Sequence, residues 1–90
     1  MENLKLLVLL NKEILVTKIE EVPSELGEPD CKLINPFIIE KNQTKDSELI
    51  LKPWLNEYAE QNTYMIHSDK ILTIADPNLN LKEKYINMIK

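Results

Sequence analysis

Hydrophobic and polar residues alternate with a period of two along the first quarter of the chain, which is the pattern of β-strands. A first strand is expected over 4–10, where apolar residues fill one face and most of the other. A second is expected over 13–22, after a short hairpin-type turn at Asn11-Lys12. Its apolar positions shift by one near Thr17-Lys18, which indicates a bulge or a sharp bend.

Two further strands with apolar residues on both faces follow. One is expected over 31–40, after a loop at 23–30 that holds two prolines and the single glycine. Pro36 lacks the N–H group that a strand ladder needs, so it must face a sheet edge or a bulge. A polar turn over 41–47 leads to the other strand, expected over 48–55. Three strands with two apolar faces carry more hydrophobic area than one small core buries, which predicts a partner.

The last part of the chain reads as two short strands and a helix. Strands are expected over 63–67 and 71–75, joined by Ser68-Asp69-Lys70 as a tight hairpin. A helix is expected over 80–90, with Asn80 as its cap and a capping box to Glu83. Its apolar stripe, which we expect to pack on the sheet, consists of Leu81, Tyr85, Met88 and Ile89.

These elements predict one domain over residues 1–90 that is mostly β. Ninety residues leave no room for two cores. Several short strands with regular turns favour a bent antiparallel sheet of five or six strands that closes into a barrel, with one C-terminal helix.

Composition removes several classes of function. A net charge of −4 has the wrong sign for a protein that coats itself with nucleic-acid phosphates. One glycine rules out the glycine-rich phosphate loops of nucleotide-binding enzymes, and one histidine with one cysteine cannot make a Cys/His zinc site. We therefore expect no enzyme, no catalytic residues, no small-molecule substrate, no cofactor and no metal. No signal peptide or membrane span is expected, which favours the cytoplasm and no contact with a membrane.

Four groups of residues still leave a functional alternative open. The run His67-Ser68-Asp69 holds the residue types of a hydrolase triad, although a polar turn is the simpler interpretation. Cys31 lies among apolar positions and is expected in the core rather than as a reactive thiol. Two larger sets are open in the same way. One is an acidic set that forms either a solvated loop or a cation site, namely Glu20, Glu21, Glu25, Glu28 and Asp30. The other is an aromatic set that either packs in the core or forms a base-stacking surface, namely Phe37, Trp54, Tyr58 and Tyr64.

Two stretches resemble the signatures of Sm-like proteins. The sequence Ile66-His67-Ser68-Asp69-Lys70-Ile71-Leu72-Thr73-Ile74 is similar to the second signature, in which Ile-Arg-Gly precedes a turn and a hydrophobic strand. Upstream, 8–16 resembles the opening hairpin of the first signature, and 32–37 falls where that signature carries Met-Asn. The resemblance covers roughly residues 10–75 and extends to small Sm-like proteins of cyanophages. It implies an SH3-like small barrel, and a host cytoplasm if the protein is of phage origin.

The resemblance also implies a partner and a site. Sm-like subunits join edge to edge into a homo-oligomeric ring, and single-stranded RNA binds around its inner rim. Asn35 and His67 match the base-contacting positions, Asp30 corresponds loosely to the acidic residue that orients them, and Lys70 would add positive charge to the rim. Two functions follow as alternatives. One is a ring that binds RNA through Asn35, His67 and Lys70, and the other is a phage structural or adaptor protein that keeps the ring without RNA.

Overall fold

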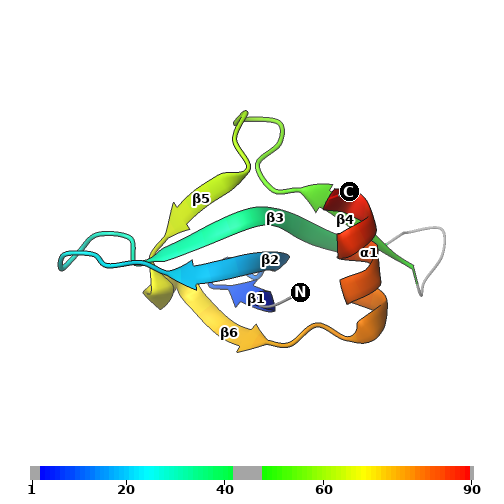
Figure 1. Cartoon of the computed structure of the whole chain (residues 1–90), viewed down its shortest axis with the longest axis horizontal. Helices are drawn as coiled ribbons and strands as arrows, with labels where there is room; N and C mark the ends of the chain where they lie inside the picture. Colours follow the sequence, from blue (N-terminus) through cyan, green and yellow to red (C-terminus); the bar gives the residue numbers. More distant parts are fainter. Residues whose placement is uncertain (1–2, 42–47, 90) are drawn as a thin grey trace.

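The structure, a computed structural model, describes residues 3–41 and 48–89. Most of the turn expected over 41–47, and the expected last helical residue Lys90, lie outside these residues. Figure 1 shows a mostly antiparallel β-structure with one C-terminal helix. The elements in chain order are β1 (Leu4–Leu9), β2 (Ile14–Glu21), β3 (Cys31–Lys41), β4 (Leu49–Pro53), β5 (Thr63–Ile66), the 3₁₀ turn η1 (Ser68–Lys70), β6 (Ile71–Ala75) and α1 (Leu79–Ile89).

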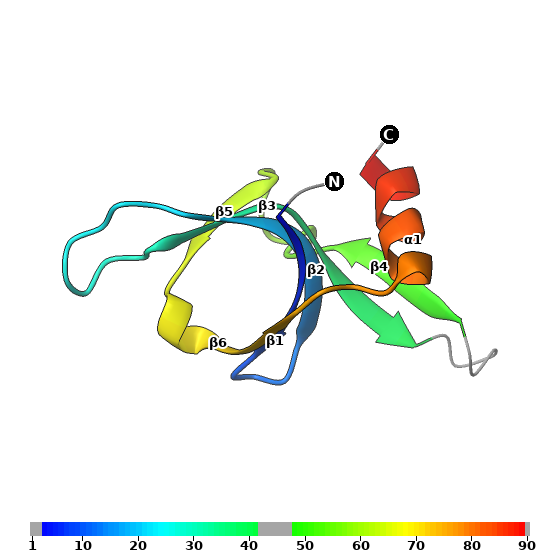
Figure 2. The ribbon, with the colours of Figure 1, turned by 60° about the horizontal axis from the view of Figure 1, so that its bottom comes forward.

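The sheet is built around β3, which has two partners in succession along one of its sides. The strand order is β4-β3-β2-β1-β6, and β5 pairs with β3 off this path. Residues 31–34 pair with β5, and residues 37–41 pair with β4. Figure 2 shows β1, β2, β3, β5 and β6 curling around one axis, while β4 and α1 lie to one side. The expected bent antiparallel β-structure with a C-terminal helix is thus confirmed.

The irregularity expected near Thr17 is present, but the extra residue belongs to β3. Val16 pairs with Phe37 and Lys18 with Ile34, so Thr17 alone faces two residues, Asn35 and Pro36. The ladder between β1 and β2 is regular through the same region. The bulge was therefore predicted near the correct position but in the wrong strand. The expectation that Pro36 occupies a bulge or an edge is confirmed, because the bulge removes the need for its N–H.

The sheet carries a hydrophobic core on each face. Side chains of the barrel core point into the curl, and those of the helix-side core lie under α1. The buried members of the barrel core are Leu7, Leu9, Leu15 and Leu33. Those of the helix-side core are Leu4, Val16, Phe37, Leu51, Leu81 and Tyr85. Neighbouring residues of one strand alternate between the two cores, so α1 covers part of the second apolar face that the sequence assigned to an external partner.

The helix begins earlier than expected. Asn78 is the cap, since its side-chain oxygen accepts a hydrogen bond of 2.8 Å from the N–H of Leu81, and α1 starts at Leu79. The predicted cap at Asn80 is wrong, because Asn78 already serves the third N–H of the helix. Leu81 and Tyr85 are buried as expected, whereas Met88 is half exposed.

The last two strands do not form the expected hairpin. β5 pairs with β3, and β6 pairs with β1. The turn η1 carries the chain from one side of the curled sheet to the other, and the N–H of Leu10 donates to the carbonyl of Lys70 at 2.9 Å. The predicted hairpin is wrong. The longer strands β3 and β1 each provide an apolar edge, and β5 and β6 pair with those edges rather than with each other.

Candidate functional site

The junction between β5 and β6 brings three of the predicted site residues together. Asp30, at the start of β3, accepts hydrogen bonds from the backbone N–H and from the hydroxyl of Ser68, both at 2.7 Å. His67 precedes Ser68, and Lys70 ends the turn with an exposed side chain. We call Asp30, His67, Ser68 and Lys70 the junction site. It holds three of the four residues that the Sm-like resemblance selected.

The geometry of Ser68 is not that of a hydrolase triad. Its hydroxyl donates to the carboxylate of Asp30, which is 38 residues away, rather than to the adjacent histidine. A triad needs an imidazole placed to take the proton of the serine. The run His67-Ser68-Asp69 is a polar turn tied to β3.

The two hydrogen bonds from Ser68 lower the pKa of Asp30 below its ordinary value, and the nearby His67 adds a smaller effect in the same direction. A carboxylate with a depressed pKa in the folded state adds stability that is present above its unfolded pKa of about 3.9 and is lost as the pH falls through the folded value. We therefore expect η1 to loosen only below about pH 4. The backbone N–H shift of Ser68, followed by NMR from pH 6 to pH 2.5, should move with this titration. In Asp30→Asn the shift should be displaced at all pH values and flat; the same titration in that variant would contradict the assignment.

A surface hollow of about 440 Å³ lies beside the junction site and is strongly acidic. Its walls come from η1 and from the loop between β2 and β3. Its lining includes His67 and four carboxylates, those of Glu25, Glu28, Asp30 and Asp69. These carboxylates oppose the approach of phosphate. In the part of the chain that the structure describes, no group of three or more His, Cys, Asp or Glu side chains could hold a metal ion, so the loop carries no cation site there.

Asn35 lies apart from the junction site, at the other end of the β3–β5 ladder. Five residues of extended chain separate it from Asp30, which is about 16 Å at 3.3 Å per residue. Its φ of +51° is left-handed, its N–H donates to the carbonyl of Asn62 at 2.7 Å, and its carbonyl accepts from the hydroxyl of Tyr85 at 3.0 Å. Asparagine tolerates this φ better than most residues, so the bulge alone accounts for an asparagine here.

Two substitutions of Asn35 distinguish the effect of its backbone conformation on stability from the effect of its side chain. Replacing Asn35 with Gly keeps the left-handed conformation accessible and should change the free energy of unfolding by less than about 0.5 kcal/mol. Replacing it with Ala places a β-carbon in that conformation and should cost about 1–2 kcal/mol. Urea unfolding measures both. Equal effects of the two substitutions would show that the carboxamide, and not φ, selects this residue.

Most of the aromatic residues considered as a base-stacking surface are packed inside the protein. Phe37 and Tyr64 are buried, and Trp54 packs against the barrel core. Trp54 and Tyr64 meet edge to face at 5.5 Å, and the Tyr64 hydroxyl donates to the carbonyl of Gln61 at 2.8 Å. Tyr58 is the exposed member of the set. Cys31 is also buried, and burial raises the pKa of its thiol, which makes it a poor nucleophile.

Two free strand edges flank the junction site, and they were not among the features predicted from the sequence. Among the residues described, β5 pairs only with β3 and β6 only with β1. Ile74 of β6 lies opposite Leu7, which is fully buried, yet Ile74 is 56% exposed. Met65 of β5 and Leu72 of β6 are also exposed. Single side chains donate to the first carbonyls of two of the strands, Gln61 to Thr63 of β5 at 2.7 Å and Lys84 of α1 to Leu49 of β4 at 3.3 Å.

One sequence feature could have indicated these edges. β6 carries apolar residues at adjacent positions, Ile71-Leu72 and Ile74, although it ends the sheet. An edge strand that only faces solvent is normally protected by charge or proline.

Within the described residues, α1 is 11 residues long, and no helix is long and apolar enough to cross a membrane. A search of curated proteins gave no match to the chain. A family model described as "Family of unknown function (DUF6561)" matches residues 2–90. Since this match spans nearly the whole chain, the protein belongs to that family.

Proposed function

We propose that the protein is an Sm-like module whose function is to assemble with itself into a ring. The observation that carries this proposal is Ile74, a residue in register with the barrel core that is 56% exposed at a free edge. A strand added beside β6 would cover it and would pair the open backbone groups of that edge. β5 provides such a strand, with its own free edge and the exposed Met65.

Pairing β5 of one copy with β6 of the next uses two different surfaces. Such a heterologous contact closes into a ring when the rotation between copies is a simple fraction of a turn. η1 connects the two edges within each copy, so it would lie at every interface of the ring. This arrangement agrees with the edge-to-edge assembly that the Sm-like resemblance implies.

Multi-angle light scattering of the purified protein at micromolar concentration tests the assembly. We expect a single species with a mass that is a whole multiple of 10.5 kDa and greater than that of a dimer. Electron microscopy should show closed particles. A stable monomer would overturn the proposal.

RNA binding by such a ring is the second candidate, and the position of η1 favours it. His67 and the exposed Lys70 lie beside the free edges, so assembly would repeat them around the ring. The acidic hollow and the distance of Asn35 from this turn weigh against strong binding. Fluorescence anisotropy with labelled U-rich and A-rich oligonucleotides at low salt and pH 6 decides between the candidates. Binding that is lost in His67→Ala and Lys70→Ala, with the ring intact, supports RNA as ligand; no binding leaves an interaction module.

A further inference from the structure

The loop between β2 and β3 ends in a turn that presents one leucine to solvent. The N–H of Glu28 donates to the carbonyl of Glu25 at 3.0 Å, and Gly27 has a φ of +88° at the third position, as in a type II turn. Leu26 stands at the second position, at the rim of the acidic hollow, and is 105% exposed, so its side chain is fully open to solvent. We call residues 25–28 the loop tip.

The arm that carries the tip is held at its base. The N–H of Val22 donates to the carbonyl of Asp30 at 3.0 Å, and the Asp30 carboxylate is bonded to Ser68. Figures 1 and 2 show the arm extending beyond the ends of β2 and β3, away from α1. A hydrogen-bonded turn on a fixed base presents Leu26 with little conformational freedom to lose on binding.

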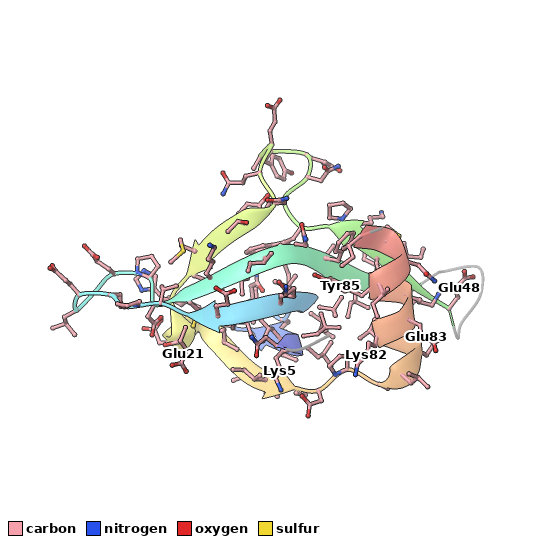
Figure 3. The ribbon with its side chains drawn as sticks, in the orientation of Figure 1. Lys5, Glu21, Glu48, Lys82, Glu83 and Tyr85 are labelled. Carbon is pink, nitrogen blue, oxygen red and sulfur yellow. The ribbon has the colours of Figure 1, made fainter. Side chains whose placement is uncertain are left out.

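A surface of matching chemistry lies on the outer face of the sheet, next to the area that α1 covers, where the Tyr85 hydroxyl donates to the carbonyl of Ile34 at 3.3 Å. The helix covers the rows that hold Val16 and Phe37. The next two rows pair Lys18 with Ile34 and Lys32 with Met65, and these side chains are partly or well exposed. Figure 3 shows α1, with Tyr85 on it, at the end of the sheet farthest from the loop between β2 and β3. We call Lys18, Lys32, Ile34 and Met65 the outer-face patch.

The charges of the two surfaces are opposite. Lys18 and Lys32 are diagonal neighbours across β2 and β3, a spacing of about 7–8 Å between positions. Glu20 faces Lys32 on the same side, which leaves two ammonium groups against one carboxylate. The tip offers the carboxylates of Glu25 and Glu28 on either side of the leucine. A cationic surface with an apolar floor is therefore complementary to an acidic turn with an apolar centre.

We propose that the loop tip docks on the outer-face patch of a second copy of this chain. Leu26 would rest between Ile34 and Met65, while Glu25 and Glu28 would pair with the two lysines. Because each copy carries one tip and one patch, a two-fold axis makes the contact twice, as in an isologous dimer. The contact uses the side chain of Met65 but no backbone group of the free β5 and β6 edges, so two rings can join face to face through it.

Replacing Leu26 with Ser tests the contact without disturbing the fold. Since the side chain is fully exposed in its own chain, the subunit should stay folded, with an unchanged far-ultraviolet circular dichroism spectrum. The mass from light scattering should fall to half that of the wild-type protein. Leu79→Ser, at a leucine 69% exposed on α1, is the matched control and should leave the mass unchanged. An unchanged mass for Leu26→Ser, or a wild-type monomer, overturns the proposal.

A charge exchange tests the partner surface. Glu25→Lys with Glu28→Lys should halve the mass, and Lys18→Glu with Lys32→Glu should do the same. Mixing the two doubly substituted proteins should restore both contacts in each pair of unlike copies, seen as recovery of the larger species. If the variant with Lys18→Glu and Lys32→Glu keeps the wild-type mass and only loses affinity for a labelled oligonucleotide, the patch binds nucleic acid and the proposal is wrong. Ring assembly is tested independently by Ile74→Lys, a substitution at the β6 edge that leaves the loop tip and the outer-face patch unchanged.

Discussion

Replacing Tyr85 with Ala should lower the free energy of unfolding by about 3–5 kcal/mol, the range for deleting a buried aromatic side chain. Tyr85 is fully buried and sits in the middle of the helix-side core. Its ring meets Phe37 edge to face at 5.6 Å, and its hydroxyl donates to the carbonyl of Asn35. The substitution therefore leaves a cavity, removes an aromatic pair and leaves the bulge without one hydrogen bond. Urea unfolding followed by Trp54 fluorescence measures the loss.

Two further substitutions divide this effect. Tyr85→Phe keeps the ring and removes only the hydroxyl, so it should cost about 1 kcal/mol. Met88→Ala, at a half-exposed position of the same helix, should change stability by less than about 0.5 kcal/mol. If Tyr85→Ala cost no more than Met88→Ala, α1 would not be the cover of this face, and the packing described above would be wrong.

The helix accounts for part of the apolar area from which the sequence predicted a partner. Apolar residues on both faces of one strand indicate that both faces are covered, but they do not indicate by what. Val16 and Leu15 are adjacent and both fully buried, one under α1 and the other inside the curl. The shift of apolar positions in β2 has the same origin, since Val16 belongs to the helix-side core and Ile19 packs on the barrel core. A change of core thus resembles a bulge in the sequence.

Local patterns predicted the strands well and their pairing less well. The expected strand at 71–75 coincides with β6, and the others differ at their ends by a few residues. The hairpin failed because alternation fixes which residues form strands, whereas pairing depends on what the rest of the sheet offers. The β-bulge was placed in the wrong strand for a similar reason, because a bulge is a relation between two strands.

The candidate site shows the same division. Asp30, His67 and Lys70 were selected and do lie around one turn, but Asp30, expected to orient Asn35 and His67, accepts its two side-chain hydrogen bonds from Ser68 instead. Asn35 was selected with them but lies at the bulge. A sequence does not show that one extra residue sits at this point of β3, nor that a left-handed φ there favours asparagine. The exposure of Ile74 was equally hidden, because it depends on a strand that the chain itself does not supply.

Replacing Ile74 with Lys should dissociate the proposed ring into subunits. In a free subunit the residue is already 56% exposed, so the change should cost less than about 1 kcal/mol of folding stability. Beside a neighbour's β5 the lysine would be a buried charge without a partner, which costs about 3 kcal/mol or more. Each interface should then weaken by a factor of at least about 100. Light scattering at micromolar concentration should show the mass falling to that of one subunit, or of two subunits if the loop tips still dock.

Leu79→Lys is the control for this result, because it adds the same charge at an exposed leucine on α1, away from both free edges. It should leave the mass of the assembly unchanged. Far-ultraviolet circular dichroism and thermal melting should show that both variants remain folded, which separates loss of assembly from loss of structure. If Ile74→Lys keeps the full mass while folded, the β6 edge is not an interface, and pairing between β5 and β6 does not build the assembly.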